Sequence, residues 1–224
     1  MRVPLILVTL GCAIAPAAAS VWTQDGLTPL ELVAIWEPLM SRDFDLVGVQ
    51  GRWSKAERYG AELRLGSEPD EVIGPWGGLH VSWDTREGSF PGGDIDVHAL
   101  MLALTGGVMF HFLPTIHPTN FDPGLAIFGR AGVGFQSGHF DNYPTDQGPV
   151  SGSVSPLRYE WALGTELQVT LFRRAVLTAG VGVTWWFANE STTVTSVGGT
   201  TTVAIDTSFS GMETWSRIGL GFRF

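Results

Sequence analysis

Apolar and polar residues alternate with a period of two along much of this chain, most clearly over residues 157–171. The apolar positions there are Tyr159, Trp161, Leu163, Leu167, Val169 and Leu171. The opposite positions are Arg158, Glu160, Gly164, Glu166 and Gln168. Such alternation predicts a strand whose two faces lie in different environments. Because the charged face could not sit in lipid, the apolar face is predicted to point outward, the reverse of a lipocalin barrel.

The last ten residues carry the same pattern and stop on an aromatic. Ile218, Leu220, Phe222 and Phe224 share one face, while arginine and glycine occupy the other. This pattern is typical of the closing strand of an outer-membrane β-barrel. In all, the sequence predicts eight strands, at residues 44–54, 60–66, 77–85, 94–112, 124–136, 157–171, 175–188 and 212–224. The predicted fold is therefore an all-β, eight-stranded antiparallel transmembrane barrel with an interior filled by side chains.

The chain begins with the features of a secretory signal. Arg2 precedes a short apolar run, and Ala17-Ala18-Ala19 supplies small residues before Ser20. The run is too short to span a membrane, so a signal peptide is predicted over residues 1–19. The only cysteine, Cys12, falls inside it, so no disulfide is expected in the mature chain. Lipidation at Cys12 is the alternative interpretation.

A short helix is predicted before the first strand. Thr28-Pro29-Leu30-Glu31 has the form of a capping box with proline at the first helical position, and an amphipathic pattern continues to about Met40. This interpretation divides the mature chain into a periplasmic segment at 20–43 and a barrel at 44–224.

The connections between predicted strands differ in length. Phe172-Arg173-Arg174 predicts a tight turn, whereas 137–156 and 189–211 are long, polar and rich in Gly, Ser and Thr. In such barrels short turns face the periplasm and long loops face outward. Gly198-Gly199 predicts a hairpin that extends the last two strands. Lys55 to Arg58 predicts a short hairpin between the first two strands.

Composition limits the partners. The formal net charge is −9, and Lys55 is the single lysine, so nucleic acid and docking on anionic lipid by basic clusters are both disfavoured. No mature segment approaches about 18 consecutive apolar residues, which leaves a closed barrel as the only way to span a bilayer. The expected partners are outer-membrane lipids, lipopolysaccharide and the barrel-insertion machinery that reads the closing strand. A monomer is expected.

A family resemblance covers about residues 94–224. It is carried by the stretch from Asp94 to Pro114, by Phe128-Gly-Arg-Ala-Gly-Val-Gly-Phe135 and by the closing Gly219-Leu-Gly-Phe-Arg-Phe224, which resemble the small eight-stranded OmpA-like outer-membrane barrels. The resemblance implies the architecture, and members of that family serve as envelope anchors, as adhesins or as barrels of no known activity. The first half is faintly similar to lipid A palmitoyltransferases, through Pro75-Trp76-Gly77-Gly78. The catalytic residues of that family have no counterpart, since 50–53 lacks a histidine and Leu104-Thr105 stands where an Asp-Ser pair is expected.

Two small clusters could carry chemistry. His80 and Ser82 resemble outer-membrane lipid A deacylases in their His-x-Ser spacing, but both are predicted to point into the barrel, away from any lipid ester. A satisfied interior hydrogen bond is the favoured interpretation. Asp94, Asp96 and His98 are predicted to project together near the outer end of the fourth strand, where oxygen ligands could bind a divalent cation. A solvated acidic rim is the favoured alternative.

A third set of residues is predicted to lie inside the barrel. It consists of Arg52, Glu62, Arg64, Arg130, Glu160, Glu166, Arg217 and Arg223. Charges in a narrow barrel must be paired or hydrated, so Glu160 and Glu166 are predicted to face Arg130 and, across the lumen, Arg217 or Arg64. A narrow hydrated path is the alternative. Six aromatics are predicted to form interface belts: Trp53, Trp83, Tyr159, Trp161, Trp185 and Phe224.

These patterns favour a non-catalytic outer-membrane barrel with a structural or surface-interaction role. A lipid A-modifying enzyme and a narrow pore are the alternatives. No catalytic, cofactor-binding or metal-binding residue is assigned from the sequence.

Overall fold

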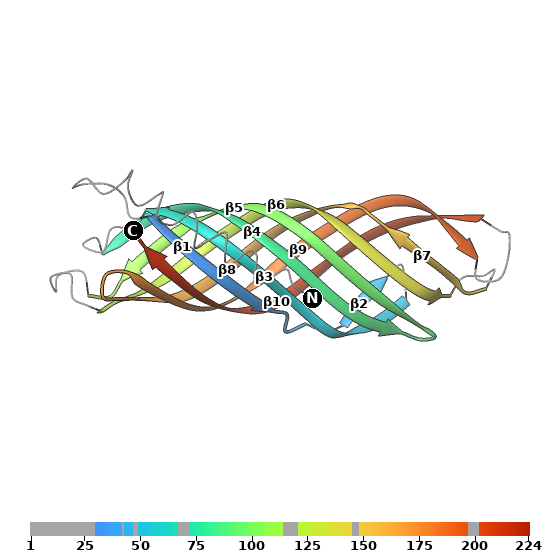
Figure 1. Ribbon diagram of the computed structural model, residues 1–224, viewed down its shortest axis with the longest axis horizontal. Coiled ribbons are helices and arrows are strands. Elements are labelled where there is room, and N and C mark those ends of the chain that lie inside the picture. Colours follow the sequence, from blue (N-terminus) through green and yellow to red (C-terminus); the bar gives the residue numbers. More distant parts are fainter. Residues whose placement is uncertain are drawn as a thin grey trace.

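The structure, a computed structural model, describes residues 30–41, 43–46, 49–66, 72–113, 121–144, 148–196 and 202–224. The described strands form one antiparallel sheet (Figure 1). They are β1 (Leu30–Pro38), β2 (Asp43–Leu46), β3 (Val49–Gly66), β4 (Ile73–Phe90), β5 (Gly93–His111), β6 (Phe121–Tyr143), β7 (Val150–Val154), β8 (Leu157–Leu171), β9 (Ala175–Ser196) and β10 (Thr202–Arg223). Eight of them close a ring in the order β1, β3, β4, β5, β6, β8, β9, β10, and β10 returns to β1. The predicted eight-stranded barrel is confirmed.

The two ends of the barrel differ (Figure 1). One end, called the turn end, holds the C-terminus and the tight turn between β8 and β9, in which Phe172 and Arg173 have φ values of 51° and 62°. The other, called the hairpin end, carries the extensions of β6, β7, β9 and β10. There β7 lies between β6 and β9 and continues the wall above β8.

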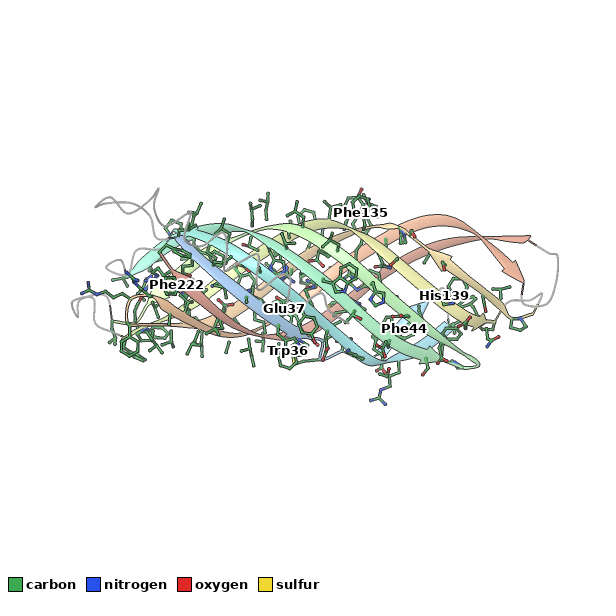
Figure 2. All side chains as sticks on the ribbon, viewed as in Figure 1. Trp36, Glu37, Phe44, Phe135, His139 and Phe222 are labelled. Carbon is green, nitrogen blue, oxygen red and sulfur yellow. The ribbon has the colours of Figure 1, made fainter. Side chains whose placement is uncertain are left out.

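The outer face of the barrel is apolar, as the alternation predicted. Leu104, Phe135 and Leu163 are 67%, 72% and 57% exposed, and Phe135 points away from the wall in Figure 2. Residues at the alternate positions of the same strands point inward, and many are buried, among them Arg130 on β6 and Glu160 on β8. With no backbone edge open along this ring, the exposed apolar surface can contact lipid. Among the described residues, no helix is long and apolar enough to cross a membrane.

The predicted N-terminal helix is wrong where the structure describes it, because Leu30–Pro38 is the first barrel strand. β1 pairs with β3 over its whole length and with β10 from Glu31 to Trp36. Its side chains also fit a period of two, with Glu31 and Glu37 buried and Trp36 exposed. Pairing on both sides satisfies the backbone of the strand, and this tertiary constraint overrides the local capping signal. The predicted signal peptide lies outside the described residues.

The hairpin predicted at Lys55 to Arg58 is also wrong. β3 runs without interruption from Val49 to Gly66, and the first part of the predicted strand 44–54 forms β2, which pairs with it. A register shift between Trp53 and Lys55 marks a β-bulge. The barrel therefore still has eight strands, because β1 replaces the strand lost when the two predicted strands merge.

The two long connections contain more strand than predicted. β6 continues to Tyr143, and β7 occupies Val150–Val154 within the predicted loop 137–156. β9 and β10 pair as far as Thr195 and Thr202, which confirms the predicted extension of the last hairpin. Gly198-Gly199 itself lies outside the described residues.

The facing pattern predicts how arginine is tolerated on the outer wall. Leu163→Arg or Val181→Arg, both near the middle of a lipid-facing strand, should destabilise the barrel in bilayers by about 2 to 4 kcal/mol, because a guanidinium would enter hydrocarbon. Phe172→Arg at the turn end is the matched control, with an expected cost of about 0 to 1 kcal/mol. Urea titrations of refolding into liposomes measure the difference. Equal stability of all three variants would contradict the facing assignment.

Candidate functional site

The lumen is the most heavily charged region that the structure describes. Seven arginines and seven carboxylates are buried there, namely Arg58, Arg64, Arg86, Arg130, Arg158, Arg217 and Arg223 with Glu31, Glu37, Glu62, Asp84, Glu160, Glu166 and Glu213. They come from six of the eight ring strands. Since the two signs are equal in number, the buried charge of the lumen sums to zero, which is the arrangement that buried ions require.

Arg58 organises the network nearest the hairpin end. Its guanidinium donates to both oxygens of Asp84, at 2.5 and 3.0 Å, and to both oxygens of Glu160, at 3.0 and 2.7 Å. Arg86 forms an ion pair with Asp84 at 3.1 Å and a second with Glu213. Arg158 joins the same group through Asp84 at 3.2 Å. Paired two-pronged contacts of this kind fix both geometry and charge.

The middle of the lumen is crossed by two further arginines. Arg130 donates to both oxygens of Glu37, at 2.9 and 3.2 Å, and lies 3.5 Å from Glu160. Arg217 reaches Glu62 at 2.9 Å and Glu166 at 3.1 Å. Because Arg217 also lies 3.7 Å from Glu37, the two arginines share a carboxylate and the network continues without a break.

The network ends near the turn end. Arg64 pairs with Glu62 at 2.9 Å and with Glu166 at 2.7 Å, and it also donates to Gln168. Gln168 in turn donates to Glu31, which pairs with Arg223 at 2.7 Å. Arg223 lies 3.7 Å from Asp122, whose carboxylate contacts His111. One chain of polar contacts therefore runs from Glu213 to His111.

Aromatic rings inside the barrel fill the space between the ion pairs. Trp76, Phe128 and Trp215 are buried and form one cluster. Arg64 lies over the Trp76 ring at 5.0 Å and Arg217 over Phe128 at 5.1 Å, which are cation–π distances. Trp215 needs the glycine beneath it, since a Cβ at Gly164 would lie 2.6 Å from its ring. The lumen is thus packed as well as neutral.

The predicted interior set is largely confirmed. Glu160 contacts Arg130, and Glu166 contacts both Arg217 and Arg64 across the lumen, as predicted. Arg52 is the exception, because its side chain is 75% exposed and lies 4.0 Å from Asp43. The bulge that follows Trp53 explains this difference, since an extra residue reverses which side chains point inward.

Sequence reasoning placed several members of the network elsewhere. Arg58 was assigned to a turn, and Glu31 and Glu37 fell in the predicted helix. The alternation of inward and outward positions along a strand could have placed these residues in the lumen. It puts Arg58 on the same strand face as Glu62, and Glu31 on the same face as Glu37. Strong local charge and the capping pattern obscured it.

His80 and Ser82 point into the barrel, as predicted, and both are fully buried. The His80 ring lies 3.4 Å from Glu62 through Nδ1 and 3.4 Å from Arg130 through Nε2. The Ser82 hydroxyl has no hydrogen-bond partner among the described residues, so the imidazole does not contact it as a base would. The expected interior hydrogen bond is therefore formed by His80, through Nε2 and Arg130, but not by Ser82.

Asp94, Asp96 and His98 lie on β5 at the hairpin end. His98 is 3.3 Å from Asp96, and both side chains are partly exposed. Asp141 on β6 pairs in register with Asp94. Among the described residues, no group of three or more His, Cys, Asp or Glu side chains is arranged to hold a metal ion.

The predicted aromatic belts are confirmed in part. Tyr159, Trp161 and Trp185 are exposed on the outer wall, at 41%, 62% and 41%. Trp53 instead faces the lumen and is buried, which is a second effect of the bulge. Trp83 is half-buried and stacks on His98, with ring centroids 5.8 Å apart.

Solved structures of small barrels resemble this one. The N-terminal β-barrel domain of Pseudomonas aeruginosa OprF aligns at 14% identity and a TM-score of 0.39, covering 89% of this chain and 100% of that one. Ail, the attachment invasion locus protein of Yersinia pestis, aligns at 17% identity and a TM-score of 0.41, covering 88% of this chain and 99% of that one. The outer membrane protein OprG from Pseudomonas aeruginosa aligns at 13% identity and a TM-score of 0.44, covering 88% of this chain and 96% of that one. No protein-family model and no curated protein matches the chain.

The closed ring of antiparallel strands, apolar outside and charged within, is the architecture of a bacterial outer-membrane protein. The chain therefore has the fold of a small outer-membrane β-barrel.

The network predicts an unequal cost for single and paired substitutions. Arg58→Met should destabilise the barrel by about 3 to 5 kcal/mol, because Asp84 and Glu160 lose a buried counter-ion. The double variant Arg58→Met/Glu160→Gln should be more stable than the single one, since neutrality is restored. Arg52→Met, the same change at an exposed position of the same strand, should cost less than about 0.5 kcal/mol. Urea unfolding in liposomes ranks the three, and a double variant weaker than Arg58→Met would refute the pairing argument.

Proposed function

We propose that this protein is a closed, non-conducting and non-catalytic barrel that anchors its hairpin end at the cell surface for interaction with other molecules. The observation that carries the proposal is the continuous chain of ion pairs and hydrogen bonds from Glu213 to His111, in which seven buried arginines face seven buried carboxylates. In this proposal the chain fills the lumen along the length of the ring.

The geometry of the network supports a plug. Each arginine in the middle of the lumen contacts at least two carboxylates, so an ion in transit would have to break several buried pairs at once. Removing one partner of a buried pair costs several kcal/mol, which is a high barrier for conduction. Neutrality also leaves no net field to attract an ion of either sign.

The exposed hairpin end supports a surface role. Its outer face carries Glu87, Asp94, Asp96 and Asp141, all exposed. A surface with this sign attracts cationic partners and repels polyanions. We infer that a partner recognised here presents positive charge.

Planar-bilayer recording tests the plug. The parent protein should give no steady conductance, because the lumen is filled and its charges are paired. The quadruple variant Arg58→Ser, Glu160→Ser, Arg217→Ser and Glu62→Ser keeps the lumen neutral, removes its bulk, and should conduct. Steady conductance of the parent at the level of this variant would favour the pore instead.

Labelling of intact cells tests which end faces outward. Ser153→Cys on β7 should react with a membrane-impermeant maleimide, because the hairpin end is proposed to be extracellular. Arg174→Cys at the turn end is the matched control and should react only after the outer membrane is permeabilised. The opposite pattern would invert the proposed orientation.

A further inference from the structure

A seam interrupts the wall at the hairpin end, where β10 loses one of its two neighbours. β1 ends at Pro38, and the last backbone contacts to β10 on this side are those of Met40 and Ser41 with Thr214, among the described residues. Beyond them β10 continues on β9, and β2 continues on β3. The two strand edges that face each other across the gap, from β2 and β10, are called here the seam.

A β-bulge marks the start of the seam. The N–H groups of Met40 and Ser41 both donate to the carbonyl oxygen of Thr214, at 2.8 and 3.4 Å, so two residues of one strand oppose one residue of the other. The Ser41 hydroxyl holds this arrangement by accepting from the Thr214 N–H at 3.1 Å. The extra residue reverses the facing along this strand, since Trp36 is exposed on β1 and Asp43 is exposed on β2.

The two edges of the seam match each other in register. β2 and β1 both run antiparallel to β3, and β1 runs antiparallel to β10, so β2 is antiparallel to β10 as well. Counting on from Ser41 opposite Thr214 places Asp43 opposite Met212, and both side chains are exposed. Backbone groups of alternate residues point to the same side of a strand. Those of Asp43 and Met212 therefore face each other, with donors opposite acceptors.

The width of the seam favours pairing of the two edges over binding of a third strand. At their nearest points the Cα atoms of β2 and β10 come within 8 Å of each other. Neighbouring strands lie about 4.8 Å apart, so a strand inserted between two others needs about 10 Å. The base of the seam is too narrow for an inserted strand, and it lacks only a few ångströms for direct pairing.

The two sides of the seam are held unequally. β2 is fixed to the wall by Phe44, whose ring lies against Trp53 with centroids 4.2 Å apart. β10 has only β9 beside it beyond Thr214, among the strands that the structure describes. An opening of about 570 Å³ lies at the seam, lined by Met40, Ser41, Asp43, Arg52 and Met212. Movement of β10 toward β2 would close this opening without disturbing the core under Phe44.

We propose that β2 and β10 pair reversibly beyond the bulge, with Asp43 opposite Met212, so that the seam opens and closes the side of the wall at the hairpin end. In the closed form these two residues exchange backbone hydrogen bonds and the opening is lost. This inference goes beyond the proposed function and does not rest on it, because it concerns the wall above the plug.

Disulfide formation tests the register of the closed seam. All variants carry Cys12→Ser and are refolded in liposomes and oxidised with copper phenanthroline. Asp43→Cys/Met212→Cys should cross-link at least about tenfold faster than Asp43→Cys/Ser210→Cys. Directly opposed residues of a closed pair lie about 5.5 Å apart between Cα atoms, within the range of a disulfide, whereas diagonal neighbours lie about 7 to 8 Å apart.

Two controls separate strand pairing from chance encounters. Ala34→Cys/Leu220→Cys, at a pair that is always in register in the ring, sets the rate of a permanently closed pair. Ser210→Pro, added to the in-register cysteine pair, removes an N–H that faces the seam and leaves the pairing of β10 with β9 intact. This proline should slow cross-linking about fivefold or more. Heat-modifiable gel mobility confirms that each barrel is folded.

The other outcomes overturn the proposal. Equal rates for the in-register and diagonal pairs would show that the edges do not pair, and a faster diagonal pair would show that the register is wrong. An unchanged rate with Ser210→Pro in a folded barrel would show that proximity alone brings the two sulfurs together. The comparison of the two cysteine pairs stands even where the proline variant fails to fold.

Discussion

The structure depends on the pairing of β1 with two strands from opposite ends of the sheet. A strand edge left open in hydrocarbon would expose a row of unpaired N–H and C=O groups, each costing several kcal/mol. β1 removes both edges by joining β3 to β10. It also completes the electrostatics, because Glu31 and Glu37 are two of the seven buried carboxylates that balance seven arginines. Without β1 the sheet would be open and the lumen would carry excess positive charge.

Much of the barrel could be predicted from the sequence because its two faces differ so strongly. From residue 94 onward, large apolar side chains alternate with glycine, arginine and glutamate, and only a barrel with a polar interior suits that pattern. The strands β1 and β3 were harder to predict from the sequence. A capping pattern around Leu30 imitates the start of a helix, and the charged run from Lys55 to Arg58 imitates a turn. Their strand character comes from pairing partners distant in sequence, which no local pattern encodes.

The charged lumen was also predictable only in part. The alternation of side chains along each strand identified most of the inward-pointing charges, including Glu160 and Arg217, because side-chain direction in a strand is a local property. It failed at Arg52 and Trp53, where one extra residue in the bulge reverses the facing. Which carboxylate meets which arginine depends on register and on contacts across the lumen. Arg58 and Glu160, for example, are 102 residues apart in the chain.

The same strand pairing explains why the lumen is filled in one part and open in another. Where the ring is complete, each inward charge has neighbours on both sides and across the lumen, so arginine and carboxylate can pack to neutrality. Beyond Thr214 the β1 side of β10 has no described partner strand, and the inward groups lose neighbours from that direction. Glu213 lies at this boundary, with one oxygen held by Arg86 and the other 3.9 Å from Arg158. A single strand end therefore separates the complete, charge-paired ring from an open pocket of about 790 Å³ at the hairpin end.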